Sequence, residues 1–214
     1  MPPPAQFLRA FTLIEMLVVM AVIAVLAAIL LNLNGLVQSK AARTRALGEI
    51  YTLSSGCESY KADNGSYPQD KDKTDLLDPR VKGDPNDSSK PTYKDSSLYL
   101  YEQLSGDLND NGRNEPNAAT PEPKGYLTDF FTPQRLGGDP TSVKFIKDPY
   151  GNSYGYSTMG AAAEQTYRTD VSKDPATAKR QTGKGYNPTF DLWSTAGKTS
   201  LSDPTTSNVW VKNW

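Results

Sequence analysis

The sequence predicts an α+β fold, in which one long N-terminal helix packs on a small antiparallel β-sheet head with long loops. Residues 11–31 form an apolar run whose only polar side chains are Thr12 and Glu15. An amphipathic stripe follows, and short apolar segments bounded by Gly, Pro or Asp occur towards the C-terminus. A chain of 214 residues has room for about one domain, so we expect one small core.

The composition argues against several classes of function. The chain has no histidine and one cysteine, Cys57, which removes His-based catalysis, most zinc sites and any disulfide within the chain. A net charge of −1, without a run of Lys and Arg that could follow phosphates, argues against nucleic-acid binding. We therefore expect no enzyme. Cys57 fits either a buried thiol or an intermolecular or reactive role.

The apolar run is long enough to cross a membrane. At 1.5 Å per residue, about 21 helical residues span about 30 Å, which is the thickness of a bilayer core. Arg9 and the initiator amine form a positive flank that should keep residues 1–10 on the cytoplasmic side. We predict a transmembrane segment over residues 11–34 of an inner-membrane protein, with the rest of the chain on the extracytoplasmic side.

Glu15 is the informative residue of this segment, because a carboxylate in an apolar span is costly. One interpretation is that Glu15 lies shallow enough to reach the lipid headgroups. The other is that it meets a cation from a neighbouring chain once helices pack together. In that case each added subunit would dock in the register that neutralises the charge.

The amphipathic helix is predicted over residues 35–65. Its apolar side chains recur at spacings of three and four residues, as one buried face requires: Leu36, Ala42, Ala46, Ile50, Leu53 and Cys57. Poor helix formers at residues 32–35 predict a point where the helix can loosen. Asp63-Asn64-Gly65, followed by Pro68, predicts the end of the helix.

The head is predicted over residues 66–214. Polar stretches at residues 70–94 and 109–123 are typical of irregular loops, and Leu and Tyr between them predict a short helix ending at Gly106. Strands of one small sheet are expected in three apolar segments, at residues 142–146, 153–156 and 190–193. We expect Trp210 and Trp214 to cover the sheet or the stalk.

The N-terminus resembles the class III prepilin signature of type IV pilins and type II secretion pseudopilins. The resemblance rests on Arg9-Ala10-Phe11-Thr12-Leu13-Ile14-Glu15 before the apolar helix, with Ala10 where the family usually has Gly. It implies a cleaved leader over residues 1–10, because a prepilin peptidase would cut between Ala10 and Phe11. The same enzyme would methylate the amine of Phe11, and Glu15 would act in assembly.

Two segments of the head are similar to the major, G-type pseudopilin. The first is Asp148-Pro149-Tyr150-Gly151-Asn152-Ser153-Tyr154, and the second is Phe190-Asp191-Leu192-Trp193-Ser194 with a closing Asn213-Trp214. The resemblance implies a structural subunit of a helical pseudopilus or pilus filament. Its partners would be further copies of itself, the prepilin peptidase, other pseudopilins, the inner-membrane assembly platform and membrane lipid.

Other functions stay open at this stage. Within the pilin-like class, the chain could be a type IV pilus subunit or a minor pseudopilin. Outside that class, it could be a membrane-anchored surface binding module that never polymerises. A secreted hydrolase with paired carboxylates has little support, because no spacing singles out a pair of Asp or Glu residues.

Calcium is the one cofactor that the sequence suggests, and the resemblance points to the loop after residues 190–194. In G-type pseudopilins this loop carries acidic residues that bind Ca²⁺, a cation that takes six to eight oxygen ligands. Here it offers Ser202, Asp203 and Asn208, with Asp203 as its only carboxylate. We expect hydrogen bonds and the packing of Trp210 and Trp214 to hold this loop, with calcium at most an accessory.

A second loop matches the first half of an EF-hand-like calcium loop. Oxygen side chains stand at its positions 1, 3 and 5, namely Asp107, Asn109 and Asn111, and Gly112 follows at position 6. Ala118 stands where the bidentate Glu belongs. We favour an ordinary Asx-rich turn here over a metal site.

Overall fold

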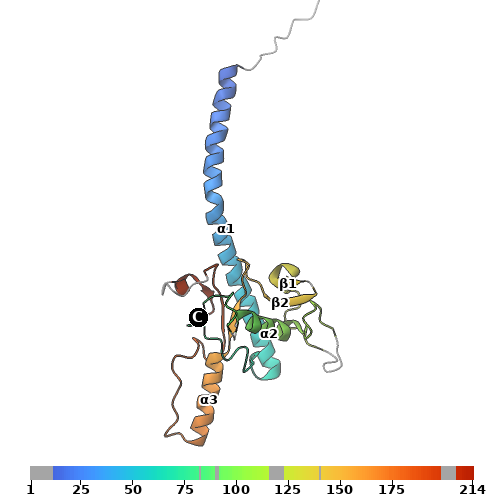
Figure 1. Ribbon diagram of the computed structural model, residues 1–214, viewed down its shortest axis with the longest axis vertical. Helices are drawn as coiled ribbons and strands as arrows, with labels where there is room; N and C mark the ends of the chain where they lie inside the picture. The colour runs from blue at the N-terminus through green and yellow to red at the C-terminus, as the bar shows by residue number, and fades with distance from the viewer. Residues whose placement is uncertain (1–11, 82, 90–91, 116–122, 140, 199–205) are drawn as a thin grey trace, which may run out of the picture. The chain divides into compact units, whose positions relative to one another are not determined.

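Figure 1 shows the computed structural model, which describes residues 12–81, 83–89, 92–115, 123–139, 141–198 and 206–214, with the backbone alone at 29–36 and 206–207. The chain divides into two compact units, residues 1–41 and residues 42–214. The helix α1 (Leu13–Asn64) contributes residues to both units.

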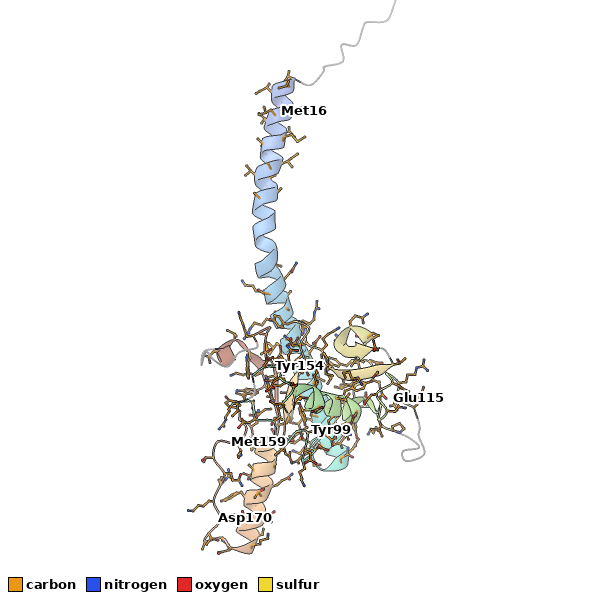
Figure 2. The ribbon with its side chains drawn as sticks, viewed as in Figure 1. Met16, Tyr99, Glu115, Tyr154, Met159 and Asp170 are labelled. Atoms are coloured by element: carbon orange, nitrogen blue, oxygen red, sulfur yellow. The ribbon has the colours of Figure 1, made fainter. Side chains whose placement is uncertain are left out.

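In the first unit, α1 is apolar on all sides. Every large apolar side chain described between Leu13 and Leu26 is 50% or more exposed, and Figure 2 shows Met16 projecting from the helix. Such a surface normally requires cover from lipid or from other helices. No described helix is long and apolar enough to cross a membrane. The span predicted at residues 11–34 includes residue 11 and the side chains of 29–34, which lie outside the described part.

The backbone of α1 is helical through residues 32–35 and ends where the sequence predicts. Asn64 is its last residue, and Gly65 follows with a φ of 77°, a left-handed conformation that glycine adopts without strain. The Gly65 N–H donates to the Lys61 carbonyl oxygen at 2.8 Å. A single chain does not test whether residues 32–35 loosen in a filament, so that expectation stays a prediction.

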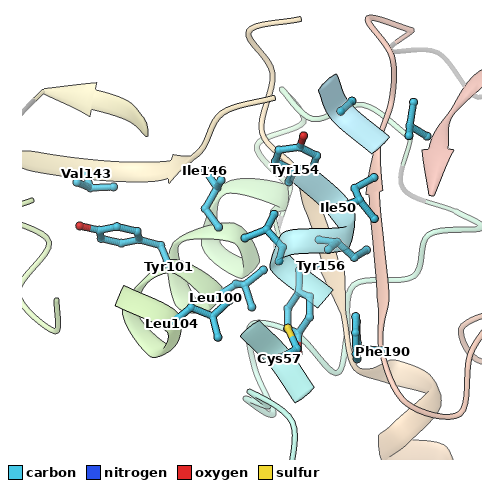
Figure 3. Packing of buried hydrophobic residues seen from close by; sticks show 14 residues of the cluster. Ile50, Cys57, Leu100, Tyr101, Leu104, Val143, Ile146, Tyr154, Tyr156 and Phe190 are labelled. Atoms are coloured by element: carbon cyan, nitrogen blue, oxygen red, sulfur yellow. The ribbon is translucent and has the colours of Figure 1, made fainter. Parts of the chain in front are cut away.

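In the second unit, the buried face of α1 forms one core with α2 (Tyr93–Ser105) and the strands. Figure 3 shows Ile50 and Cys57 of α1 beside Leu100 and Tyr156. The fully buried members of this core include Ala46, Ile50, Leu53, Cys57, Leu100, Leu104, Ile146, Tyr154, Tyr156 and Leu192. The predicted α+β fold class is confirmed.

The helix α2 is the short helix predicted before Gly106. Thr92 and Asp95 form a capping box at its start, and Gly106 ends it with a φ of 78°. The Gly106 N–H donates to the Glu102 carbonyl oxygen. The described residues of the loops expected on either side of α2 form turns, bends and irregular backbone, except that α2 begins at Tyr93, inside the first predicted loop.

The strands of the described residues form two sheets, so the prediction of a single sheet is wrong. In the first, β1 (Leu136–Asp139) pairs with β2 (Ser142–Ile146); in the second, β3 (Gly155–Ser157), β4 (Asp191–Ser194) and β5 (Val211–Lys212) pair in that order, all antiparallel. Between the end of β2 and the start of β3, the described residues form an isolated bridge, Lys147 with Ser153. The Ile146 N–H donates to Ser97 Oγ of α2 at 2.9 Å, so the end of β2 turns towards a helix.

One helix was missing from the sequence prediction. The helix α3 (Met159–Lys173) follows β3 closely; its first three residues are buried, and the others are half-buried or exposed. The signal for it is the run Ala161-Ala162-Ala163-Glu164-Gln165, which consists of strong helix formers. Two short 3-10 helices, Pro133–Arg135 and Thr206–Val209, complete the elements of the described residues.

Candidate functional site

Glu15 lies in the first turn of α1 and caps that helix. Its Oε2 accepts hydrogen bonds from the Thr12 N–H and from Thr12 Oγ1, both at 2.8 Å. In return, the Glu15 N–H donates to Thr12 Oγ1 at 3.3 Å. This reciprocal pair is a capping box, and the spacing Thr12-x-x-Glu15 is the sequence signal that could have revealed it. In the single chain, the charge of Glu15 therefore has a local partner.

Most of the other residues assigned to processing and to the C-terminal metal loop are outside the part of the chain that the structure describes. Ala10, Phe11, Ser202 and Asp203 lie outside the described residues. Asn208 is described, and it is an exposed residue of the 3-10 helix before β5. The cleavage, methylation and calcium assignments therefore stay predictions.

The Asp107 loop folds as an Asx-rich turn. Asp107 is 1% exposed, and its carboxylate accepts hydrogen bonds from Tyr101 Oη at 2.6 Å and from the Gly112 N–H at 2.7 Å. Asn109 Oδ1 accepts from the Asn111 N–H at 3.4 Å. The oxygen atoms of the expected ligands thus bind the loop's own backbone. Within the described residues, no group of three or more His, Cys, Asp or Glu side chains could hold a metal.

Asp148 joins the two head motifs that the sequence analysis singled out. Its Oδ1 accepts from the N–H groups of Tyr150 and Asn152, which closes the turn after β2. Its Oδ2 accepts from Ser194 Oγ of β4 at 2.6 Å. Burial raises the pKa of Asp148 above its ordinary value, against the effect of these hydrogen bonds. The Asp of the first motif and the Ser of the second are therefore partners.

Asp191 and Asn213 hold the chain beside β4. Asp191 is 1% exposed and accepts from the N–H groups of Tyr186 and Asn187 at 2.7 and 2.9 Å. Burial raises its pKa as well. Asn213 Oδ1 accepts from the Leu192 N–H at 2.9 Å, and its Nδ2 donates to the Phe190 carbonyl oxygen at 3.1 Å. The side chain of Asn213 therefore extends the β4 pairing.

The tryptophans of the tail pack as expected. Trp193 and Trp210 are fully buried and stacked, with ring centroids 6.2 Å apart, and Trp214 meets Trp193 edge-on at 5.8 Å. Trp193 Nε1 donates to Tyr93 Oη of α2 at 2.9 Å. A Cβ on Gly155 would lie 2.2 Å from the Trp193 ring, so glycine is required beneath the indole. The packing of Trp210 and Trp214 over the second sheet is confirmed.

Arg43 of α1 contacts the C-terminal tail, and the sequence did not predict this contact. From α1, its Nη1 donates to the Val209 carbonyl oxygen at 2.5 Å, and its Nη2 approaches the Trp210 carbonyl oxygen at 3.5 Å. These carbonyls close the C-terminal loop before β5. A guanidinium therefore contacts the end of the loop in which the resemblance implied calcium.

Cys57 is a buried thiol. It is 0% exposed in the core, and burial raises its pKa far above the ordinary value. A neutral, enclosed thiol is a poor nucleophile, so this geometry favours packing over a reactive role.

Two comparisons with known proteins bear on the site. Residues 9–31 match the model of the prokaryotic N-terminal methylation motif. The chain is also 38% identical over 80 residues to the type II secretion system core protein G of Pectobacterium carotovorum subsp. carotovorum. The resemblance to pseudopilins is confirmed.

The pseudopilin-like chain shares only part of its length with that relative. The alignment covers 36% of this chain and 51% of the relative, so the chain spans about half the length of the curated protein that it matches. No solved structure matches the chain significantly. The methylation motif and the related secretion protein together favour a pilin-like subunit and membrane anchoring.

Proposed function

We propose that the pseudopilin-like chain is a structural subunit of a helical filament, namely the major pseudopilin of a type II secretion system. Its partners would be further copies of itself, other pseudopilins and the inner-membrane assembly platform. Its role would be mechanical, with no catalytic step of its own. Residues 1–10 would be a leader, residues 11–34 would anchor the chain in the inner membrane, and the head would lie outside the cytoplasm.

The observation that carries this proposal is the uncovered apolar surface of α1 within the matched methylation motif. Residues 13–26 expose large apolar side chains on every side, and Glu15 is their only charge. Lipid can cover such a helix before assembly, and the same helix of neighbouring copies can cover it afterwards. A binding module anchored in a membrane would need the apolar helix but would not need a carboxylate in it.

Processing would supply the partner for this carboxylate. Cleavage before Phe11 creates an amine that is cationic near neutral pH. In its own chain Glu15 already binds Thr12, so a docking amine from another copy would join or replace that cap. A charge pair near 4 Å is worth a few kcal/mol at an effective dielectric of about 20, before desolvation is subtracted.

The processing step can be tested by intact-mass spectrometry of the chain, produced with and without a prepilin peptidase. We expect a product that starts at Phe11 and carries one methyl group, only when the peptidase is present. Ala10→Gly should be cut at least as well, and Ala10→Glu should not be cut. A mature chain that begins at Met1, or beyond residue 31, would reject the proposal.

A further inference from the structure

An open cavity in the second unit is used neither by processing nor by the turn motifs. Its volume is about 220 Å³, and we call it the cationic cavity. It lies where α1, the 3-10 helix before β1 and the turn after β2 meet. Its lining consists of Arg45, Glu49, Thr132, Gln134, Arg135, Lys147, Asp148 and Pro149.

The two carboxylates in the lining are buried and already have partners. Glu49 is 6% exposed; its Oε1 accepts from Arg135 Nε at 3.1 Å and its Oε2 from Tyr154 Oη at 2.8 Å. Asp148 is 3% exposed and accepts from Ser194 Oγ and from two backbone N–H groups. Among these lining residues, the pair of Arg135 with Glu49 is the one ion pair between described side chains.

The three cations of the lining are therefore only partly compensated. Arg135 pairs with Glu49 and donates through Nη1 to the Phe130 carbonyl oxygen at 3.0 Å. The side chains of Arg45 and Lys147 form no hydrogen bond or ion pair with any other described residue, although the Lys147 backbone N–H donates to the Arg135 carbonyl oxygen at 2.7 Å. Arg45 is exposed and Lys147 is half-buried. Three cations against two carboxylates leave one net positive charge around the cavity.

We propose that the cationic cavity binds a phosphate-type anion, either the headgroup of an anionic phospholipid or a free phosphate. Arg and Lys are the side chains that bind phosphate in proteins, and here they approach one space from three elements. Thr132 and Gln134 add neutral hydrogen-bond donors beside them. The partial burial of Lys147 protects its attraction from screening by salt.

A phosphate suits this set of donors better than the carboxylate of a second copy does. Phosphate oxygens are arranged tetrahedrally, both in a free phosphate, which carries up to two negative charges near neutral pH, and in a phospholipid diester, which carries one, whereas the two oxygens of a carboxylate lie in one plane. Arg45, Arg135 and Lys147 come from three elements, so an anion with acceptors in several directions can contact all three.

The lipid source follows from the proposed membrane anchoring, and on this point the inference rests on the proposed function. Arg45 follows the proposed membrane segment, which ends at residue 34, within the next few turns of sequence. Cations that flank a membrane segment attract anionic headgroups. Binding of a free phosphate requires no membrane, so the two sources can be separated by experiment.

The test is isothermal titration calorimetry on the full chain in an uncharged detergent. The probes are inorganic phosphate, dihexanoyl phosphatidylglycerol and, as a zwitterionic control, dihexanoyl phosphatidylcholine. We expect the wild type to bind phosphatidylglycerol more tightly than phosphatidylcholine. Arg45→Gln combined with Lys147→Gln should weaken that binding about tenfold or more, because two charge-assisted contacts are lost.

The matched control is Lys144→Gln, which removes the same charge from an exposed position of β2 outside the cavity. It should bind like the wild type. Since the side chains of Arg45 and Lys147 form no hydrogen bond or ion pair with a described residue, the double variant should fold normally, and circular dichroism checks this.

If inorganic phosphate binds to the wild type and not to the double variant, the ligand of the cavity is a free phosphate. If only phosphatidylglycerol binds, the ligand is the headgroup of a lipid. Absence of binding to both probes, or equal binding by the double variant, would overturn the inference. If neither probe binds and the double variant assembles poorly, the cavity instead receives a carboxylate of a second copy. Calorimetry needs no filament, so its failure is distinct from failure of the filament proposal.

Discussion

At the scale of single residues, the polar positions of the head motifs act as buried connectors. The carboxylate of Asp148 accepts hydrogen bonds from two backbone N–H groups of the turn after β2 and from the hydroxyl of Ser194 in β4. The carboxylate of Asp191 accepts from two backbone N–H groups of the loop before β4. The side-chain amide of Asn213 donates to the Phe190 carbonyl oxygen at the start of β4. A buried donor or acceptor that loses its partner costs about 1–3 kcal/mol. The polar residues of these motifs therefore stabilise the fold of the head.

Asp148→Ala tests this role. The change leaves two backbone N–H groups and the Ser194 hydroxyl without their acceptor, so we expect the free energy of unfolding to fall by about 2–4 kcal/mol. Thermal unfolding followed by circular dichroism on the full chain in detergent measures the loss. Asp129→Ala, at an exposed position, is the matched control and should be neutral. Equal midpoints for the two variants would contradict the connector role.

Glu15 has two separable roles, as a helix cap and as a charge. Glu15→Gln keeps an acceptor for Thr12 and removes the charge, whereas Glu15→Ala and Glu15→Val remove both. We expect all three variants to insert into the membrane and to assemble poorly. Thr12→Val, which removes the hydroxyl and keeps the charge, should still assemble.

Membrane fractionation reports insertion of these variants, and the amount of sheared, pelleted filament reports assembly. Filaments of Glu15→Gln at the wild-type amount would show that the charge of Glu15 does not guide docking. Loss of filaments in Thr12→Val alone would assign the role to the cap.

At the scale of elements, the C-terminal tail is attached to the head through protein contacts on both sides of β5. Arg43 contacts the Val209 carbonyl oxygen before β5, and Asn213, which follows β5, contacts the chain at the start of β4. The stacked Trp193 and Trp210 cover the sheet from which the tail extends. These contacts favour a tail that needs no metal for its place.

This attachment predicts how the tail responds to mutation and to calcium. Asn213→Ala should lower the free energy of unfolding by about 1–3 kcal/mol, because the Leu192 N–H loses its acceptor. Asp203→Ala, in the loop with the sequence-predicted ligands, should leave the thermal midpoint unchanged, and so should replacing a chelator with micromolar calcium. A midpoint that rises by many degrees with calcium would reveal a metal site in the tail or at Asp107.

The elements also show what could be predicted from the sequence. The end of α1 at Asn64 and the end of α2 at Gly106 were predictable, because Gly in a left-handed conformation is a local signal. The split into two sheets was not, because strand pairing and contacts such as that between Ile146 and Ser97 of α2 join residues that are distant in the sequence. The run of alanines in α3 was also a local signal, because alanine is the strongest helix former.

The same division holds for the candidate site. The apolar run and the carboxylate of Glu15 within it could be recognised from the sequence, because both lie in one continuous segment. The pairing of Asp148 with Ser194 and the contact from Arg43 to the tail required the tertiary structure, since their partners lie far apart in the chain. The capping box of Thr12 and Glu15 could also be predicted from their spacing in the sequence.

At the scale of the whole molecule, the chain combines two units with different needs. The unit of residues 42–214 buries its own core, including Ile50, Leu100 and Trp193. The first unit exposes the apolar side chains of residues 13–26, which nothing within the described residues covers. A filament would supply that cover from other copies, and a head with its own core could then line the outside.

The most direct test of this account is the intact mass of the chain recovered from sheared, pelleted surface filaments of cells that also produce a type II secretion assembly system. We predict recovery in the filament fraction with the mass of residues 11–214 plus one methyl group. A chain that stays in the membrane fraction with residues 1–10 attached, while the system's own pseudopilin is recovered in filaments, would contradict the account.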